Sequence, residues 1–330
     1  MKAFIHHGAQ GLAGTSYTEM EERQPGRGEV KVRLKTAGLN HRDLFVPYRR
    51  KPEDPPVILG SDGAGVIEGV GPDVHHVRLG DEVMINPTLG WPTKSAAPPK
   101  GYEILGHPDH GTFAEYIVIS AENVEQKPEA LTWEEAGVLP LAALTAYRAL
   151  FTRAKVQPGQ TVLIPGIGSG VATFMLQMAK AVGAHVYVTS RSEFKRKKAE
   201  ALGADKTIDS HDDWNASLQG EKVDIVIESV GAATFEKSLR QLRPGGTLVT
   251  FGATAGEEIK LNIRSFFYGQ YNMLGTTMGS TEEFREMLDF IKKHRIKPII
   301  DKMYPLAETL DALKRLDKGE QFGKIGLYIE

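Results

Sequence analysis

A regular alternation of short apolar runs and helical patterns between residues 161 and 251 is the feature that most constrains the fold. Residues 161–164 are apolar, and apolar side chains then recur every three or four positions as far as Val182, which is the spacing of a helix. Further strands are predicted over residues 185–189, 223–227 and 247–251. Strands that alternate with helices form βαβ units with right-handed crossovers. We therefore predict an α/β domain with a doubly wound parallel sheet.

The chain before this region has a different pattern. Residues 29–37 alternate apolar and polar side chains, as expected for a half-buried strand. Three more strands are predicted, bounded by glycines, at residues 64–70, 82–85 and 113–119. The tail after residue 279 is predicted to hold a helix over 282–294 with Thr281 as its N-cap, a second helix over 306–316 and a strand over 324–329. We expect a small, irregular β domain at the N-terminal end.

Composition excludes several classes of function. The 40 Lys and Arg residues against 42 Asp and Glu residues give a net charge of -2, which argues against binding to nucleic acid or an anionic membrane. The chain has 0 cysteines, so it forms no disulfide and has no thiol nucleophile or thiolate metal ligand. The first nine residues lack a signal-peptide pattern, and the most apolar stretch, residues 136–147, is too short to cross a bilayer. We expect a cytoplasmic protein.

The strand at 161–164 leads directly into a run of glycines. A dinucleotide pyrophosphate requires free backbone N–H groups, the positive end of a helix dipole and no obstructing side chain. Gly166, Gly168 and Gly170 provide this gap, with Ser169 and Val171 as their neighbours, although the literal GxGxxG spacing is absent. Because the run lies within a βαβ series, we predict a Rossmann dinucleotide site rather than an ordinary turn.

The residues after the second strand indicate which dinucleotide binds. NAD-specific sites place an acidic residue at the end of this strand, but the strand ends here at Ser190 and Arg191. Lys195 and its neighbours add positive charge at the start of the following helix. A ribose 2′-phosphate would accept charge-assisted hydrogen bonds from Arg191, so we predict NADP(H). The alternative is a solvated basic helix face, balanced by Glu193 and Glu200.

Several segments together resemble the medium-chain dehydrogenase/reductase family, over nearly the whole chain. The resemblance is strongest to its zinc-free quinone oxidoreductases and their zinc-type alcohol dehydrogenase-like relatives. The segments that carry it are AGLNHRDL at 37–44, GSDGAGVIEGVG at 60–71, GDEV at 80–83, GTFAEY at 111–116, LPLAALTAY at 139–147, LRPGGTLVTFG at 242–252 and LGTTMGS at 274–280. The resemblance implies a GroES-like irregular β-barrel domain at 1–127, a Rossmann NADP-binding domain at 128–278 and a return of 279–330 to the first domain. It also implies a homodimer.

Zinc-dependent members of this family bind their catalytic metal through residues that match Asn40, Ser61 and Leu141 here. None of these side chains is a good zinc ligand, and the segment at 88–110, which matches the structural zinc lobe, has no cysteine. The cluster from His107 to His110 suits a turn better than chelation. We therefore expect no metal.

Without a metal, hydrogen-bond donors must stabilise the negative charge that grows on the substrate oxygen. The segments flanking the lost metal offer three candidates, Asn40, Tyr48 and Ser61. Each has an alternative interpretation: Asn40 as a helix N-cap with Asp43 three residues later, Tyr48 as a surface tyrosine and Ser61 as a turn residue.

The resemblance also implies further contacts with the coenzyme. They are expected from Thr145, Gly252, Ala253, Thr254, Gly275, Thr276, Thr277 and Lys324. A quinone or α,β-unsaturated carbonyl spreads the developing negative charge over several atoms. A site without a metal therefore has to stabilise less charge on the oxygen than it would for a simple ketone. We therefore expect an NADPH-dependent quinone or enone oxidoreductase. A metal-free alcohol or aldehyde dehydrogenase and an NADPH-binding accessory or sensor protein with little turnover are the alternatives.

Overall fold

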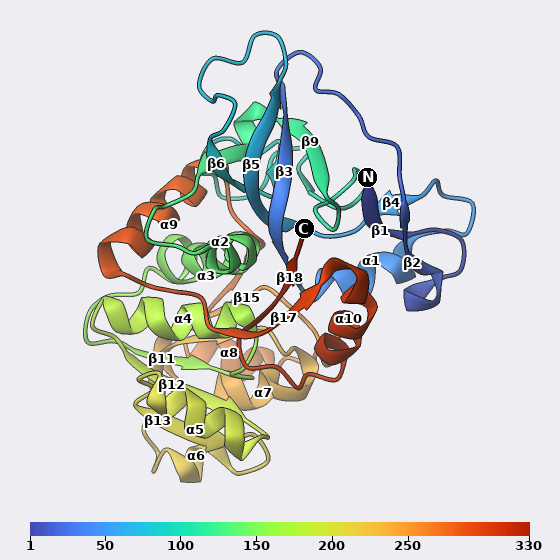
Figure 1. Cartoon of the computed structure of the whole chain (residues 1–330). Helices are drawn as coiled ribbons and strands as arrows, with labels where there is room; N and C mark the ends of the chain where they lie inside the picture. The colour runs from blue at the N-terminus through green and yellow to red at the C-terminus, as the bar shows by residue number, and fades with distance from the viewer. The chain divides into compact units, whose positions relative to one another are not determined.

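The computed structural model describes residues 1–330 and divides the chain into two units (Figure 1). Unit 1 comprises Met1–Ala142 and Gly279–Glu330, and unit 2 comprises Ala143–Met278. None of the helices is long and apolar enough to cross a lipid bilayer.

Unit 1 is built mainly of strands. Its elements before residue 143 are β1 (Lys2–His6), η1 (Gly11–Gly14), β2 (Thr15–Glu19), β3 (Glu29–Gly38), α1 (Arg42–Arg49), β4 (Val57–Ile58), β5 (Asp62–Val70), β6 (Glu82–Ile85), β7 (Thr88–Leu89), β8 (Glu103–Ile104), β9 (Tyr116–Ser120), η2 (Ala121–Asn123), β10 (Val124–Gln126), α2 (Trp133–Val138) and the first residues of α3 (Pro140–Tyr147). The tail adds α9 (Thr281–His294), β17 (Ile300–Pro305), η4 (Leu306–Glu308), α10 (Thr309–Asp317) and β18 (Lys324–Tyr328).

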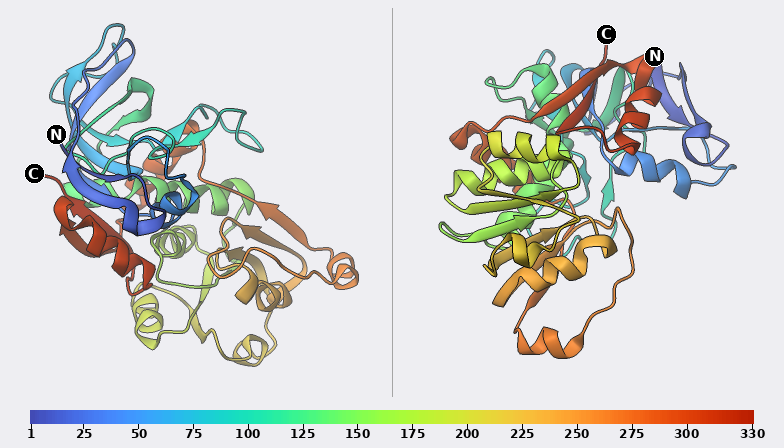
Figure 2. Two further views of the ribbon diagram at one scale, coloured as in Figure 1. Left: turned by 90° about the vertical axis from the view of Figure 1, so that its right-hand side faces the viewer. Right: turned by 90° about the horizontal axis from the view of Figure 1, so that it is seen from below.

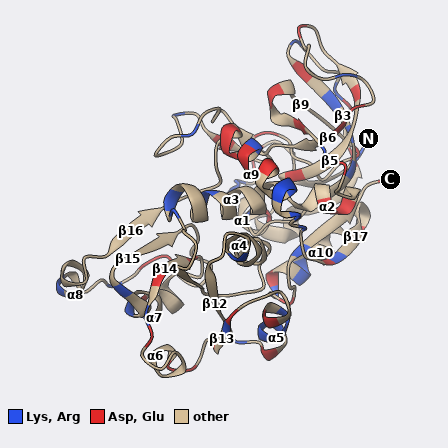
Figure 3. Ribbon diagram, turned by 90° about the vertical axis from the view of Figure 1, so that its left-hand side faces the viewer, with Lys and Arg blue, Asp and Glu red and all other residues tan.

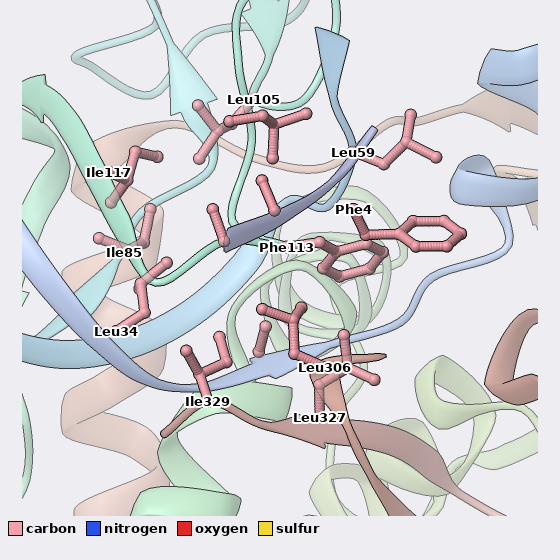
Figure 4. Close-up of a cluster of buried hydrophobic side chains, with 14 of the residues drawn as sticks. Phe4, Leu34, Leu59, Ile85, Leu105, Phe113, Ile117, Leu306, Leu327 and Ile329 are labelled. Atoms are coloured by element: carbon pink, nitrogen blue, oxygen red, sulfur yellow. The ribbon is translucent and has the colours of Figure 1, made fainter. Parts of the chain in front are cut away.

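The central strand of unit 1 is β3, which has the predicted alternation. Its Val30, Val32 and Leu34 side chains are buried. The main sheet has the order β10-β6-β5-β3-β18-β17, and β9 pairs with β3 as well. The tail strand β18 therefore lies beside β3, so the C-terminal segment adds strands to the sheet of unit 1. Figure 4 shows part of the core that this sheet encloses, with Phe4 and Phe113 close to Leu306 and Leu327.

Residues 128–142 belong to unit 1, whereas we predicted a boundary at residue 127. The physical reason is the packing of α2 on β3, β5 and β18. A Cβ atom added to Gly38 would lie 2.7 Å from the Cα atom of Val138, so the helix backbone sits directly on the strand.

One local prediction in unit 1 is wrong. Thr281 is not the N-cap of α9: the helix begins at Thr281, and Ser280 caps it in a capping box with Glu283. The segment from residue 88 to 110, which matches the structural zinc lobe of the resembling family, contains the β7–β8 pair, and its Trp91 packs edge-on against Tyr102 at a centroid distance of 5.2 Å.

Unit 2 contains the βαβ series. Its elements are the rest of α3, η3 (Arg148–Arg153), β11 (Thr161–Ile164), α4 (Gly170–Ala181), β12 (His185–Ser190), α5 (Glu193–Ala201), β13 (Lys206–Asp209), α6 (Trp214–Ser217), β14 (Val223–Glu228), α7 (Ala232–Gln241), β15 (Leu242–Thr250), α8 (Ile263–Tyr268) and β16 (Asn272–Gly275).

The sheet of unit 2 has the order β13-β12-β11-β14-β15-β16, and all its pairs are parallel. The order reverses between β11 and β14, and Figure 2 shows helices on both faces of the sheet. This confirms the predicted doubly wound Rossmann sheet. In such sheets ligands bind at the carboxyl ends of the strands near the reversal point, which is where β11 enters the glycine turn.

Candidate functional site: a coenzyme turn and a buried lysine cluster

The glycine turn of unit 2 has the backbone geometry that only glycine adopts freely. Gly166 has φ 74° and Gly168 has φ 130°, and the turn leads into the first residue of α4, Gly170. Ser169 caps this helix, because its hydroxyl accepts a hydrogen bond from the N–H of Ala172 at 3.1 Å. Val171 follows in the first helical turn, whose N–H groups have no partner within the helix. This arrangement fits the pyrophosphate of a dinucleotide.

Lys195 lies against the same turn. A Cβ atom added to Gly168 would be 2.7 Å from the Cδ atom of Lys195 and 3.1 Å from its ammonium nitrogen. The structure thus brings the lysine and the glycine turn together, although 27 residues separate them in the sequence. A cation at this place suits an anionic ligand.

The tip of β12 carries Ser190 and Arg191, as predicted. Ser190 is buried and its hydroxyl accepts from the N–H of Ser192 at 3.2 Å, while Arg191 is exposed. Arg196 donates to the Ser190 carbonyl at 2.6 Å and to Oδ2 of Asp209 at 2.8 Å. This neighbouring carboxylate, at the end of β13, is therefore already neutralised by Arg196.

The alternative interpretation, in which α5 has a solvated basic face balanced by Glu193 and Glu200, is correct in part. Lys197 pairs with Glu193 one turn away on α5, which carries both signs of charge along its length (Figure 3). Glu200, which we expected to balance a cation, instead accepts from the hydroxyl of Thr207. Arg196 and Lys197 of α5 are therefore engaged in ion pairs with carboxylates, while Arg191, before the helix, makes none.

The remaining predicted coenzyme residues of unit 2 lie at the carboxyl edge of the sheet, with Thr145 on α3. Those at or directly after the ends of β15 and β16 are Gly252, Ala253, Thr254, Gly275, Thr276 and Thr277. The N–H of Thr276 donates to the carbonyl of Thr250 at 2.9 Å, but its buried Oγ1 has no hydrogen-bond partner. A buried hydroxyl without a partner costs about 1–3 kcal/mol, which a ligand group that bonds to it would recover. These residues fit a bound nicotinamide coenzyme.

Glu228 was missed by the sequence analysis. It ends β14 and is fully buried. Its carboxylate accepts hydrogen bonds from the N–H of Val230 at 2.7 Å, the N–H of Gly231 at 3.2 Å and the hydroxyls of Thr234 and Ser238. A carboxylate directly after the apolar run at residues 225–227 was the signal available in the sequence.

Unit 1 contains a second polar group of residues, the buried lysine cluster, formed by Asn40, Asp62 and Lys324. Asp62 begins β5 and Lys324 begins β18, and these strands flank β3 (Figure 1). The Lys324 ammonium donates to the Leu39 carbonyl at 2.7 Å, to Oδ1 of Asn40 at 2.6 Å and to Oδ2 of Asp62 at 3.1 Å. We predicted that Lys324 contacts the coenzyme, but its three N–H groups are all used within unit 1.

The Asp62 carboxylate closes the buried lysine cluster. Its Oδ2 also accepts from Nδ2 of Asn40 at 2.9 Å, and its Oδ1 accepts from the N–H of Leu141 at 2.8 Å. Complete burial raises the pKa of Asp62, and the adjacent Lys324 ammonium and the Asn40 amide oppose this rise. Three neighbouring groups, Asn40, Lys324 and the N–H of Leu141, therefore depend on this one carboxylate for their geometry or charge balance.

The N-cap interpretation of the Asn40 side chain is wrong. Helix α1 begins at Arg42, its N-cap residue is His41, and no side chain caps it. Only the reverse half of a capping box is present, since the N–H of Asn40 donates to Oδ2 of Asp43 at 2.7 Å. The Asn40 amide is thus available to the buried lysine cluster instead.

Asp43 is buried beside this cluster, and its burial raises the pKa to about 6. The nearby Arg42 and Lys324 cations and the N–H of Asn40 oppose the rise, whereas Asp62 adds to it. Because the folded pKa exceeds the ordinary value of 3.8, the unfolded chain loses this proton at lower pH than the folded chain does. The contribution of Asp43 to stability therefore falls as the pH rises from about 4 to about 6.

We expect this titration to appear in a comparison of the wild type with Asp43→Asn. The asparagine still accepts from the Asn40 N–H but carries no charge. Between about pH 5 and about pH 8 the free energy of unfolding of the wild type should fall by roughly 1 kcal/mol relative to that of the variant. Urea unfolding of both proteins at the two pH values measures this difference. A constant difference would mean that Asp43 ionises at its ordinary pKa in the folded chain.

Ser61 belongs to a different network. Its hydroxyl donates to the Leu105 carbonyl at 2.8 Å and accepts from Nη1 of Arg42 at 2.7 Å. Arg42 also donates to the carbonyls of Leu105 and Ile104, and its burial lowers its pKa. Ser61 has no proton left for a substrate, so the structure favours the alternative of a turn residue over the predicted donor.

Tyr48 lies on α1 and is 62% exposed. Its ring packs on Gly11, where an added Cβ atom would be 2.6 Å from Cε1, and its hydroxyl makes no hydrogen bond within the chain. These contacts fit the alternative interpretation of Tyr48 as a surface tyrosine. The role of Tyr48 as a hydrogen-bond donor to the substrate stays a prediction.

The residues that match the zinc positions of the resembling family do not fit a zinc ion. Asn40 is bonded to a lysine, Ser61 to an arginine, and Leu141 is apolar. No group of three or more His, Asp or Glu side chains is arranged to hold a metal. The Nδ1 atom of His110 already accepts a hydrogen bond from the N–H of Ile58 at 3.2 Å.

Comparisons with known proteins give a consistent result. Residues 26–129 match the alcohol dehydrogenase GroES-like domain, and residues 170–293 match the zinc-binding dehydrogenase domain. The zinc-type alcohol dehydrogenase-like protein YogA of Leptosphaeria maculans is 34% identical over 92% of each chain. A second zinc-type alcohol dehydrogenase-like protein, from Schizosaccharomyces pombe, is 37% identical over 92% of this chain and 91% of its own. The solved structure of an NAD-dependent alcohol dehydrogenase covers 100% of both chains with a TM-score of 0.92 and 35% identity.

Proposed function

The chain belongs to the medium-chain dehydrogenase/reductase family of NAD(P)-dependent oxidoreductases, and we propose that it reduces quinones or α,β-unsaturated carbonyl compounds with NADPH and without a metal ion. The observation that carries the proposal is the buried lysine cluster. Its Asn40, Asp62 and Lys324 side chains are bonded to one another, and Asn40 matches a position where zinc members of the family have a metal ligand.

Unit 2 supplies the coenzyme contacts in this proposal. The bound nicotinamide supplies the hydride. The turn at Gly166 and Gly168, the N-terminus of α4 and Lys195 bind the pyrophosphate, and Arg191 binds the 2′-phosphate. The absence of a carboxylate at the tip of β12 and the neutralisation of Asp209 by Arg196 support NADPH over NADH.

Unit 1 supplies the groups that act on the substrate. Asn40 donates a hydrogen bond to the carbonyl oxygen, where negative charge grows as the hydride arrives. A conjugated substrate spreads this charge over several atoms, so that one amide donor stabilises it sufficiently, and solvent delivers the proton. A simple ketone concentrates the charge on one oxygen and requires stronger stabilisation of that oxygen than these residues provide.

The second candidate is a metal-free alcohol or aldehyde dehydrogenase. It is favoured by the names of the similar proteins, including the NAD-dependent alcohol dehydrogenase, and that name also favours NADH. The proposal further includes a homodimer, supported by the unpaired edge of β16 within the chain and by the exposed Ile263, Phe267 and Tyr268 of α8.

A substrate panel tests the proposal. We expect purified protein to consume NADPH, followed by its absorbance, with 1,4-benzoquinone, 9,10-phenanthrenequinone and 2-cyclohexenone. Consumption should be at least tenfold slower, about 1.4 kcal/mol in barrier, with saturated ketones and aldehydes. Dialysis against a chelator should leave the rate unchanged, with a zinc-dependent alcohol dehydrogenase treated in parallel as the control.

Three results would contradict the proposed function. A preference for alcohols and aldehydes supports the second candidate, and a rate abolished by the chelator refutes the metal-free mechanism. Tight binding of NADPH without consumption across the whole panel supports an accessory or sensor protein.

A further inference from the structure

The amide of Asn40 has one electrostatically permitted orientation. Its Oδ1 accepts from the Lys324 ammonium at 2.6 Å, and one of its N–H groups donates to the Asp62 carboxylate at 2.9 Å. Rotating the amide by half a turn would place the NH₂ group against the ammonium and the oxygen against the carboxylate. Both contacts would be repulsive, and the cluster is buried, with Asn40 7%, Asp62 0% and Lys324 3% exposed.

In this orientation the second N–H of the Asn40 amide is left without a hydrogen-bond acceptor. The amide uses its oxygen on Lys324 and one N–H on Asp62, and no other hydrogen bond of this side chain is formed. The ammonium draws electron density from Oδ1, and hydrogen bonds in such a chain strengthen one another, so the remaining N–H is a better donor than a free asparagine amide. An oxygen that becomes negative is the partner for such a group.

Lys324 is itself fixed. Its three N–H groups meet three acceptors, the Leu39 carbonyl, Asn40 and Asp62, and Asp62 is held in turn by the N–H of Leu141 at 2.8 Å. A lysine with all its donors used cannot contact another ligand without breaking one of these bonds. Its charge therefore acts through Asn40 rather than directly.

We propose that Lys324 and Asp62 are positioning residues that hold Asn40 as an oriented hydrogen-bond donor to the substrate oxygen. The inference rests on the proposed function, because it takes Asn40 to be the group that contacts the substrate. It assigns Lys324 a role in the reaction other than the coenzyme contact that the family resemblance implies. No bond to carbon or hydrogen is made or broken by either positioning residue.

A double-mutant cycle tests this role, using the quinone or enone that the panel shows to react fastest. Asn40→Ala should lower kcat by about 100-fold, as for the loss of one oxyanion donor. Lys324→Met should lower kcat by about ten- to a hundredfold, as for groups that orient a site residue. In the Asn40→Ala background Lys324→Met should have no further effect, because the group that it positions is absent.

Coenzyme affinity separates positioning from direct contact. The Kd for NADPH, measured by fluorescence titration without turnover, should be unchanged in every variant, and Lys324→Arg should recover part of the lost kcat. Because Lys324→Met leaves a buried carboxylate alone, Lys324→Met/Asp62→Leu serves as a second variant with no unpaired charge. It should lose kcat to a similar extent. Lys318→Met, on an exposed lysine just after α10, is the control and should match the wild type.

The experiment distinguishes failure of the proposed function from failure of the inference about Lys324. If Asn40→Ala has full activity, the proposed donor is wrong and the inference falls with it. If Asn40→Ala is impaired but both Lys324 variants are active, the inference alone is overturned. It is also overturned if the losses multiply in the combined variant, or if Lys324→Met weakens NADPH binding, since either result means that Lys324 acts independently of Asn40.

Discussion

Glu228→Ala is expected to lower the free energy of unfolding by about 4 kcal/mol, the upper range for the loss of a buried polar network. The substitution removes the acceptor of four hydrogen bonds, from the N–H groups of Val230 and Gly231 and the hydroxyls of Thr234 and Ser238. The donors of Gly231, Thr234 and Ser238 would remain buried without this partner, and the cavity left by the side chain adds to the cost. Urea unfolding followed by tryptophan fluorescence measures the change, because Trp214 lies in the core of unit 2.

The same substitution should also weaken the binding of NADPH. The segment after Glu228 lies against the glycine turn, since a Cβ atom on Gly166 would be 2.8 Å from the Cγ2 atom of Val230. It also lies against the loop after β15, where the N–H of Ala232 donates to the Gly256 carbonyl at 2.9 Å. Glu236→Ala, on the exposed face of the same helix α7, is the matched control and should change neither property. A stable Glu228→Ala protein would show that solvent or neighbouring groups replace the carboxylate.

The architecture of unit 2 was predictable because its signals are local. The strand at Thr161–Ile164, the glycines after it and the apolar spacing of α4 lie within one short stretch, and each of them depends on the conformation of adjacent residues. The same holds for the tip of β12, where Ser190 ends the strand and Arg191 follows it directly. Local geometry and hydrophobic pattern therefore determine both the sheet and the predicted coenzyme turn.

The buried lysine cluster was not predictable in this way. Asn40 and Lys324 are 284 positions apart, and Asp62 and Lys324 are 262 apart. Their contact depends on β18 pairing with β3, and no pattern around Lys324 specifies this pairing. For the same reason the sequence suggested an N-cap for Asn40 and a substrate contact for Ser61, because the partners that occupy these side chains come from distant segments.

Arg191→Ala is expected to lower kcat/KM for NADPH by about ten- to a hundredfold, which corresponds to the loss of charge-assisted hydrogen bonds worth about 1.5–3 kcal/mol. The value for NADH should change less than about twofold, because NADH has no 2′-phosphate. Arg191 is exposed at the tip of β12, whereas Arg196 and Lys197 are paired with Asp209 and Glu193. Arg191 can therefore bind a phosphate without breaking an existing ion pair. Initial rates with each coenzyme in both proteins give the comparison.

Lys197→Ala provides the matched control for this prediction. It removes a cation from the same helix, but one whose charge is already met by Glu193 at 2.6 Å. If general attraction of an anionic coenzyme by the basic helix were the cause, Arg191→Ala and Lys197→Ala would reduce kcat/KM for NADPH equally, and added salt would reduce it in the wild type as well. If Arg191 binds the 2′-phosphate directly, only Arg191→Ala has the large effect, and the ratio of NADPH to NADH activity collapses in that variant alone. A wild type that uses both coenzymes equally would refute the assignment, because the phosphate would then contribute no binding energy.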